Sequence, residues 1–588
     1  MKKKIINISL ITILTIILSM SFYQCKVKSS DDSGGEDTET PTEYILHLVK
    51  AMGNLKIICY ASTDTYEAYF HIPIAFEEQV PIFLEIKSNE LVNYRFVRLA
   101  PPNVIVCATM KKSILSELNW QAWVLIKEVK GGSSGLPDFV AMPHPEDLPA
   151  ETLPWLNATA CVQVDDPLIG EKAAAVRGNK ENLLALRFSI ASFCKNEIAS
   201  GLNRTPWSFD AVSAIKWGNT CTGHAHAGAA LFRANGVPAR SILNIPHFDP
   251  PASMDMHWII DYYIPAYGWI KMETSQGLST YDSYRTVVTM VCEPEYENPL
   301  FYPSGIEGYW FSSDPNVGIP NWGSAHSAVT GPYYTVSKEE LDHVHSLANS
   351  AWDRYIDLRG INAGEEAQAY IETAYGYQSE ASGKLWAEDI AGGIDSLQNA
   401  FDNLERVAIN PIQTIFFDDF ENGGVGWDHG GTEDEWEWGP PAYGTFSAHS
   451  GENCWGTDLD DNYENNADCW LLSPVIDLGN LSCAYLSVYI RNSLAGDNRQ
   501  GTFLDPFWIE IREVGKSFQQ LCTSMGGVND DPEIPDAGDW GFLTLDLTRY
   551  TGSKIQIRFR LKSNEQDVSS GSHIDDFHVY GRISQTSD

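Results

Sequence analysis

Alternating hydrophobic and polar residues predict strands at both ends of this chain. The runs LKIICYA, YEAYFHI, IFLEIK, VIVCATM and QAWVLIKEV each change polarity at nearly every residue, which is typical of half-buried strands. The break KGGSSGLPDF follows them, so we expect a β-sandwich-like domain over residues 43–135. Alternating runs with Gly- and Asp-rich turns return near the end of the chain and predict a second all-β domain over residues 411–583.

The middle of the chain has a helical hydrophobic period instead. ENLLALRFSIASFCKNEI places apolar residues three and four apart, and later segments mix helical and strand patterns. We therefore expect an α+β domain over residues 136–337. KEELDHVHSLANSAWDRYIDLRG and AEDIAGGIDSLQNAFDNLERV are also helical in period and predict a helical spacer over residues 338–410.

The N-terminus is typical of an export address. The cationic MKKK precedes an apolar run that ends just before Cys25, so residues 1–25 are expected to direct export. The polar stretch that follows predicts a flexible linker over residues 26–42. Cys25 resembles the acylated cysteine of bacterial lipoproteins, although Phe-Tyr-Gln stands before it in place of small residues. An uncleaved anchor and ordinary cleavage are the alternatives. Each of them places the rest of the chain outside the cytoplasm, and lipidation would attach it to a bacterial membrane in the cell envelope.

Composition and charge exclude several classes of protein. The 588 residues are 43% hydrophobic and 12% aromatic, which excludes a disordered or collagen-like chain. Lys and Arg number 40 against 78 Asp and Glu, and a net charge of −38 repels nucleic acid. The 11 cysteines form no CxxC pair or regular framework. Only Cys454 and Cys469, which flank a loop, are spaced as a candidate disulfide.

The segment GNTCTGHAHAGAALFRANGVPAR, residues 218–240, contains the most informative cysteine. Asn219 or Thr220 can cap a helix that ends near Gly236. Cys221 would then lie in the first turn, where the helix dipole stabilises a thiolate and backbone N–H groups can hold an oxyanion. A nucleophilic cysteine also needs a base.

A hairpin further along the chain supplies a candidate base. HWIIDYY and GWIKMET flank the turn IPA, and we expect Tyr263 to pair with Tyr267 across it. This register sets His257 directly opposite Glu273, with Cβ atoms about 5 Å apart, close enough for the carboxylate to hold the imidazole. A slip of one residue would move Glu273 to the other face.

Each of these residues also has an ordinary structural interpretation. Cys221 would be a buried small residue and His257 a sheet residue. Cys221, His224 and His226 form a C-x2-H-x-H pattern, but they do not converge on one helical face, which argues against zinc. Arg240 is expected to be structural. Three tryptophans are candidates either for a substrate groove or for packing: Trp217, Trp258 and Trp269.

Taken in order, Cys221, FRANGVPAR, HW, and GW followed by an acidic residue resemble the transglutaminase-like superfamily. The resemblance covers about residues 150–285. It implies a papain-like fold in which a helix carrying the cysteine packs on an antiparallel sheet carrying the other two residues. It also implies that Cys221 is the nucleophile, His257 the general base and acid, and Glu273 the orienting acid. The family usually has Asp at this last position, so Glu273 is a departure.

A Cys–His–acid set performs acyl transfer without a cofactor. With water as the acceptor the protein would be a peptidase or amidase acting on protein or peptide substrates, which is the interpretation we favour. With a lysine amine it would be a cross-linking transglutaminase. A surface adhesion or scaffold protein that keeps the fold without turnover is the alternative from another class, and the Glu273 departure favours it.

The last domain contains LLSPVIDLG, IRFRL and SHIDDFHVYG, and it resembles MAM-like and carbohydrate-binding-like jelly-roll modules. This resemblance implies a glycan or cell-surface ligand. Acidic residues in the first and last strands are candidate ligands for a structural Ca²⁺, which prefers oxygen donors; the alternative is that they are solvated turn residues. The candidate ligands are Asp419, Glu421, Asp575 and Asp576.

Overall fold

The computed structural model describes residues 43–59, 64–99, 101–130, 136–159, 161–201, 209–246, 256–265, 267–277, 286–291, 310–311, 317–318, 324–361, 364–443, 446–494, 505–523, 540–565 and 568–584. The expected export segment with Cys25 and the linker lie outside these residues. Within them, no helix is both long enough and apolar enough to cross a membrane.

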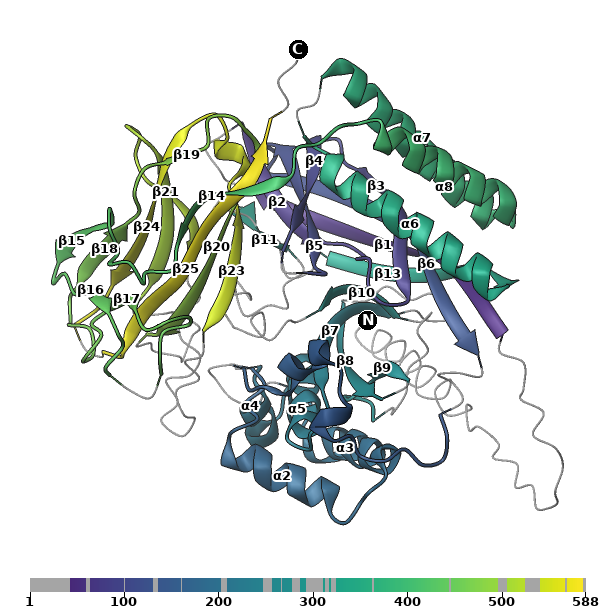
Figure 1. Ribbon diagram of the computed structural model, residues 1–588, viewed down its shortest axis with the longest axis horizontal. Helices are drawn as coiled ribbons and strands as arrows, with labels where there is room; N and C mark the ends of the chain where they lie inside the picture. Colours follow the sequence, from purple (N-terminus) through teal and green to yellow (C-terminus); the bar gives the residue numbers. More distant parts are fainter. Residues whose placement is uncertain are drawn as a thin grey trace, which may run out of the picture. The chain divides into compact units, whose positions relative to one another are not determined.

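Two antiparallel sheets, here called the N-terminal sheets, begin the described chain (Figure 1). The first has the order β12-β1-β6-β3, with β13 also paired to β1, and the second has the order β11-β2-β5-β4. Buried residues of both sheets belong to one hydrophobic core. The strands are β1 (Glu43–Cys59), β2 (Thr65–His71), β3 (Gln79–Lys87), β4 (Leu91–Arg98), β5 (Val104–Lys111), β6 (Leu115–Lys130), β11 (Trp310–Phe311), β12 (Val317–Gly318) and β13 (Ser324–Val336).

The last three of these strands correct the expected domain boundaries. The region 136–337 was predicted to be one catalytic domain, but β11, β12 and β13 complete the N-terminal sheets. β13 pairs with β1 from Tyr44↔Val336 to Leu55↔Ser324. β6 occupies only one edge of β1, so the other edge needs a partner for its backbone groups, and β13 supplies it.

The central segment forms the expected α+β layer. Its sheet has the antiparallel order β10-β7-β8-β9, and α5 packs on β7 and β8, where Phe232 stacks on Tyr262 with ring centroids 4.7 Å apart. The predicted helix over ENLLALRFSIASFCKNEI is confirmed as α3. The elements are η2 (Pro145–Asp147), η3 (Ala150–Leu156), α2 (Pro167–Arg177), α3 (Leu183–Glu197), α4 (Ala211–Trp217), α5 (Cys221–Arg233), β7 (Ala239–Pro246), β8 (His257–Ile264), β9 (Gly268–Met272) and β10 (Thr286–Val291).

The predicted helical spacer over 338–410 is instead a packed layer. It contains α6 (Lys338–Leu358), α7 (Glu365–Trp386) and α8 (Ile390–Glu405). Figure 1 shows these helices lying along the N-terminal sheets, and α6 and α7 both contact β3. The rings of Phe83 and Tyr375 are 5.1 Å apart, and those of Phe96 and Trp352 are 5.4 Å apart. The apolar faces of these helices therefore join the first core.

The C-terminal sandwich contains two antiparallel sheets with a core of their own. Their orders are β16-β17-β25-β20-β23, with β14 paired to β25, and β15-β18-β24-β21-β22, with β19 paired to β24. The elements are β14 (Ile412–Asp418), β15 (Asp428–Thr432), β16 (Trp436–Gly439), β17 (Cys454–Thr457), β18 (Asp468–Leu472), β19 (Ile476–Asp477), β20 (Leu481–Ser493), β21 (Phe507–Glu513), β22 (Gln519–Thr523), β23 (Gly541–Asp546), η7 (Thr548–Tyr550), β24 (Lys554–Lys562) and β25 (Gly571–Ile583). The predicted β-sandwich is confirmed.

The candidate disulfide in this sandwich is wrong. Cys454 lies on β17 and Cys469 on β18, and these strands belong to different sheets. Both residues are buried free thiols. Their place in the hydrophobic packing, rather than a covalent bond, accounts for them.

Candidate active site

Cys221 is the first residue of α5, as the sequence predicted. Thr220 is the N-cap, and its side chain makes no capping hydrogen bond. The Asn219 Oδ1 accepts a hydrogen bond from the Thr220 backbone N–H at 2.9 Å, which fixes the entry to the helix. The cysteine is half-buried, whereas the rest of the helix is buried. The thiol thus lies at the positive end of the helix dipole, where first-turn N–H groups can stabilise an anion.

The hairpin that carries the other two residues forms with a different register from the predicted one. β8 pairs with β9 from Ile260↔Met272 to Ile264↔Gly268, so the pairing is displaced by two residues from the expected register. A displacement of two keeps every side chain on the same face. The predicted register is therefore wrong, but the predicted face for His257 and Glu273 is correct.

His257 and Glu273 are in direct contact. The His257 Nε2 is hydrogen-bonded to the Glu273 Oε2, and the Glu273 side chain is only 1% exposed. The second carboxylate oxygen, Oε1, accepts hydrogen bonds from the backbone N–H and the hydroxyl of Ser275, each at 2.7 Å. On the neighbouring strand, the Asn244 Nδ2 donates to the His257 carbonyl oxygen at 2.7 Å. Both the side chain and the backbone of His257 are thus held in place.

The electrostatics of the site link the three residues. Burial of the imidazole disfavours its charged form, but hydrogen bonds with Cys221 and Glu273 outweigh this cost and raise the pKa of His257 to about 10. Burial alone would raise the pKa of Glu273, yet the bonds from His257 and Ser275 lower it. The imidazole that is bonded to Glu273 through Nε2 is thus also hydrogen-bonded to the Cys221 side chain. The contacts therefore favour the charged forms of His257 and Glu273.

The zinc alternative finds no support at α5. The His224 Nδ1 is bonded to the Thr220 carbonyl oxygen and the His226 Nδ1 to the Phe209 carbonyl oxygen, each at 2.7 Å. In the described part of the chain, neither histidine belongs to a group that could hold a metal ion.

Arg240 and two of the tryptophans are packing residues. The Arg240 guanidinium is bonded to Asp261 at 3.1 Å and to Glu77 at 2.9 Å, which confirms its structural role. The same group lies 3.8 Å from the Trp269 ring centroid, and Trp258 is completely buried beside His226. Both tryptophans therefore fit the packing interpretation.

The acidic residues predicted to bind Ca²⁺ hold a loop instead of forming one ligand set. Glu421 accepts the N–H groups of Glu452 and Asn453, Asp575 accepts that of Ser450, and Asp576 accepts the Ser450 hydroxyl. Asp419 accepts the N–H of Glu421. Among the described residues, these four are not gathered at ligand distance, and calcium there stays a prediction.

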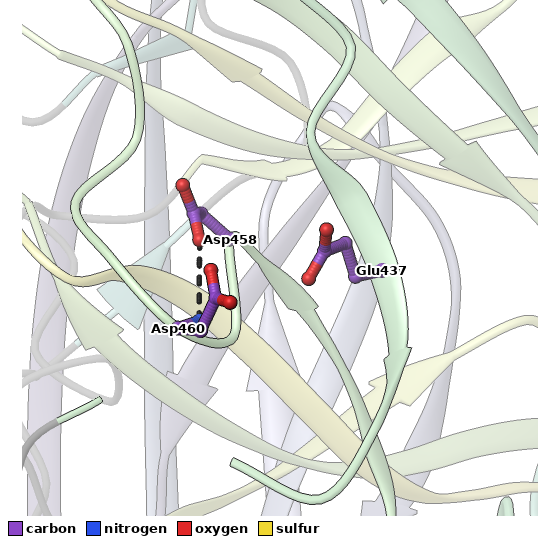
Figure 2. Close-up of side chains that lie close together, drawn as sticks. All are labelled: Glu437, Asp458 and Asp460. Atoms are coloured by element: carbon purple, nitrogen blue, oxygen red, sulfur yellow. Dashed lines mark hydrogen bonds between the residues drawn. The ribbon is translucent and has the colours of Figure 1, made fainter. Parts of the chain in front are cut away.

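A different acidic group lies nearby in sequence. Figure 2 shows Glu437, Asp458 and Asp460, whose carboxylate oxygens come within 4.8 Å of one another. The Asp458 Oδ1 accepts the Asp460 N–H at 3.2 Å. Exposed acidic groups of this kind are common without an ion.

Comparison with known proteins identifies the central segment. Residues 171–274 match the family model of the transglutaminase-like superfamily. The central segment is a transglutaminase-like domain. The matched range contains Cys221, His257 and Glu273. This domain supports an enzyme with a peptidase- or hydrolase-type function.

Other similarities are more limited. The chain is 31% identical over 171 residues to Bacillopeptidase F of Bacillus subtilis (strain 168), which is 29% of this chain and 11% of that protein. A candidate cysteine protease from Cytophaga hutchinsonii is 16% identical with a TM-score of 0.37, covering 50% of this chain and 93% of its own. The K3 cleaved adhesin domain of Lys-gingipain from Porphyromonas gingivalis w83 is 18% identical with a TM-score of 0.22. The match covers 28% of this chain and 98% of that domain. The chain spans about a tenth of the curated relative, so the substrates of the whole protein are proposals.

Two supporting residues were not predicted from the sequence. Ser275 follows Glu273 by two residues in a turn, a position where short hydroxyl side chains often bond to neighbouring polar groups. That pattern could have been noticed. Asn244 could not, because nothing in a buried strand indicates which residue lies across from His257.

Proposed function

We propose that this protein is a thiol-dependent peptidase or amidase that acts through an acyl-enzyme. The observation that supports this most directly is the series Cys221–His257–Glu273, which begins at the N-terminus of α5. A nucleophile, a base within hydrogen-bond reach and a third group that orients the base are the recurring parts of covalent acyl transfer.

The reaction would proceed in two halves. The Cys221 thiolate attacks an amide carbonyl, and first-turn N–H groups of α5 stabilise the oxyanion. The His257 imidazolium gives its proton to the leaving amine as the C–N bond breaks, which leaves a thioester and a neutral imidazole. The imidazole then takes a proton from water, the hydroxyl adds to the thioester, and the acid and the thiol are released. Glu273 stabilises the imidazolium in both halves.

The test is the pH dependence of iodoacetamide labelling of Cys221, measured by peptide mass spectrometry on the full chain. An ordinary thiol with a pKa of about 8.5 is only about 1% ionised at pH 6.5. We expect fast labelling at that pH in the unaltered protein and its loss in His257→Ala. Labelling that rises only in the alkaline range and is unchanged in His257→Ala would contradict the proposal and favour a scaffold.

The acceptor is decided by a second assay. Release of free acid from a peptide amide, without incorporation of a fluorescent amine into a glutamine-bearing protein, would support hydrolysis. Incorporation of the amine would instead support cross-linking.

We further propose that the protein is attached to the cell envelope through Cys25, and that the C-terminal sandwich binds a glycan or surface ligand. The apolar run before Cys25 and the β-sandwich architecture support this arrangement. Incorporation of labelled palmitate that Cys25→Ala abolishes tests the anchor. Retention of the sandwich on immobilised glycans, compared with the unlinked matrix, tests the ligand.

A further inference from the structure

The acidic position of the site is the place where this chain departs from its family, and the structure shows what accompanies that departure. The Glu273 carboxylate is bonded on one oxygen to His257 and on the other to Ser275. Ser275 therefore contacts the group that orients the imidazole without itself reaching the thiol. Resting on the proposed function, we infer that Ser275 is a positioning residue, which makes the longer Glu273 side chain an effective orienting acid.

The strand register explains why a longer side chain is needed. The last described pair between β8 and β9 is Ile260↔Met272. Glu273 follows Met272 directly, so this register places it two positions from direct opposition to His257, and Ser275 lies in the turn after β9. Residues two positions away from direct opposition lie about 7–8 Å apart, against about 5 Å for a direct pair. The extra methylene of glutamate helps to close that gap, whereas aspartate at 273 would fall short of it.

A longer side chain also has more freedom, which the surroundings of Glu273 remove. Thr274 packs tightly against α5: a Cβ added at Gly228 would lie 2.7 Å from the Thr274 Cγ2. The turn that carries Ser275 is thus seated on the helix that carries Cys221. With the turn fixed, the Ser275 N–H and hydroxyl hold Oε1 in one place, and Oε2 is aimed at His257.

The same bonds tune the charge of the site. The Ser275 hydroxyl stabilises the ionised carboxylate, and that carboxylate stabilises the imidazolium. Cys194 is completely buried on this side of the site, and its burial, together with the charge of Glu273, raises the pKa of its thiol to about 12. In such surroundings, the loss of one donor is poorly compensated by solvent.

The test is the pH profile of the iodoacetamide labelling rate of Cys221 in Ser275→Ala. The part that matters is the acid limb, the range below neutral pH in which the rate falls as the pH falls. Without the hydroxyl, Glu273 holds its proton to higher pH and supports the imidazolium less well. We expect the limb to move up by about one pH unit, which is about tenfold slower labelling at a fixed acidic pH. Ser275→Thr keeps the hydroxyl at this half-buried position and should restore the profile.

A matched control is Ser241→Ala. Ser241 is completely buried on β7 of the same sheet, and its hydroxyl has no hydrogen-bond partner among the residues described. It should leave the limb in place. In a Glu273→Asp background, where the side chain no longer reaches both partners, we expect slow labelling and little further effect of Ser275→Ala.

The outcomes separate this inference from the proposed function. A Ser275→Ala profile equal to that of the unaltered protein would overturn the inference, as would equal losses in Ser275→Ala, Ser275→Thr and Ser241→Ala, because these indicate packing alone. If the unaltered protein labels as an ordinary thiol, the proposed function fails first, and the inference fails with it.

Discussion

The chain has two regions of paired β-sheets, and they relate to the transglutaminase-like domain in opposite ways. The N-terminal sheets share one hydrophobic core with the transglutaminase-like domain and recruit strands from beyond it. The C-terminal sandwich has its own core, and all its strands come from one continuous stretch of sequence. Similar secondary structure can therefore either share the hydrophobic core that holds the candidate active site or form an attached module with its own core.

Polar contacts sharpen this difference. The Gln79 side chain pairs with the backbone of β10 as a neighbouring strand would. Its amide donates to the Val288 carbonyl oxygen at 2.9 Å and accepts from the Val288 N–H at 2.8 Å. Asn103 does the same for Val291 at 2.7 and 2.8 Å. The N-terminal sheets thereby finish the edge of the sheet that carries His257. They are built into the domain, which is unlike a pro-segment laid over it.

The contacts with the C-terminal sandwich are of another kind. Arg95 pairs with Asp546, whose side chain is only 2% exposed. A small apolar cluster on the second N-terminal sheet, centred on Tyr69 and Val97, packs against Tyr485 and Phe542. These contacts join the surfaces of two regions that have separate hydrophobic cores, and neither surface contains a residue of the candidate active site.

The largest expected effect comes from removing each region in turn. Deletion of residues 43–135 should leave no folded protein, because β13 and the helices α6 and α7 would lose the sheet on which they pack. A chain ending at residue 410 should keep the full pH profile of Cys221 labelling, with lower solubility from the newly exposed apolar cluster. Circular dichroism measures whether each shortened chain folds, and iodoacetamide labelling measures the reactivity of Cys221. Loss of labelling in the chain that ends at residue 410 would contradict the distinction between the two regions.

A matched pair of point variants should give a smaller and more selective effect. Gln79→Ala leaves the buried N–H of Val288 without its partner, at about 1–3 kcal/mol, while the Val288 carbonyl keeps the bond from the Ile74 N–H at 3.1 Å; the variant should lower both the thermal midpoint and the labelling rate. Arg95→Ala leaves Asp546 buried and unpaired, which costs about 3–5 kcal/mol, and should destabilise the attachment while Cys221 labels as before. If Arg95→Ala slows labelling as much as Gln79→Ala does, the two regions are not distinct.

The sequence predicted the local arrangement of the candidate site residues better than the assembly around them. Cys221 at a helix start and the shared face of His257 and Glu273 are local properties, visible in spacing and alternation. The exact register was missed because the turn includes Tyr267 and closes at Gly268, whose φ of +81° is the left-handed conformation that ends a three-residue hairpin loop. A glycine at that position could have been recognised.

The pairing of strands that lie far apart in the chain could not be predicted from the sequence. Nothing in residues 324–336 shows that their partner is β1, which lies nearly 300 residues earlier in the chain. In the same way, the apolar stripes of α6 and α7 predict burial but do not name the surface that covers them. The boundary at 337 was wrong for this reason. The bounds 338–410 agree with α6 to α8, and only their interpretation as a spacer was wrong, because a hydrophobic period predicts an element but not the surface that packs against it.

The smallest expected effect separates the two regions by pH. Burial, together with the charge of Asp576, raises the pKa of Asp575 to about 7, so the folded C-terminal sandwich holds a proton that the unfolded chain releases near 3.9. Its stability should therefore fall as the pH rises from about 4 to 7. In the region that holds the candidate active site, the raised pKa of His257 contributes stability that is complete below about pH 6.5 and is lost as the pH rises from about 6.5 to about 10, and the lowered pKa of Glu273 contributes stability that is lost only in acid.

Hydrogen exchange of the full chain at pH 5 and pH 6.5 measures both regions at once. We expect faster exchange at pH 6.5 in the C-terminal core, after correction for the intrinsic rate, and unchanged protection in the core around α5, because the His257 contribution is lost only above about pH 6.5. Asp575→Asn should remove the first effect without altering the second, because it deletes the titrating group and leaves His257 and Glu273 untouched. A parallel loss of protection in both cores would mean that the two regions unfold as one unit, and the C-terminal sandwich would then be as much a part of the enzyme as the N-terminal sheets.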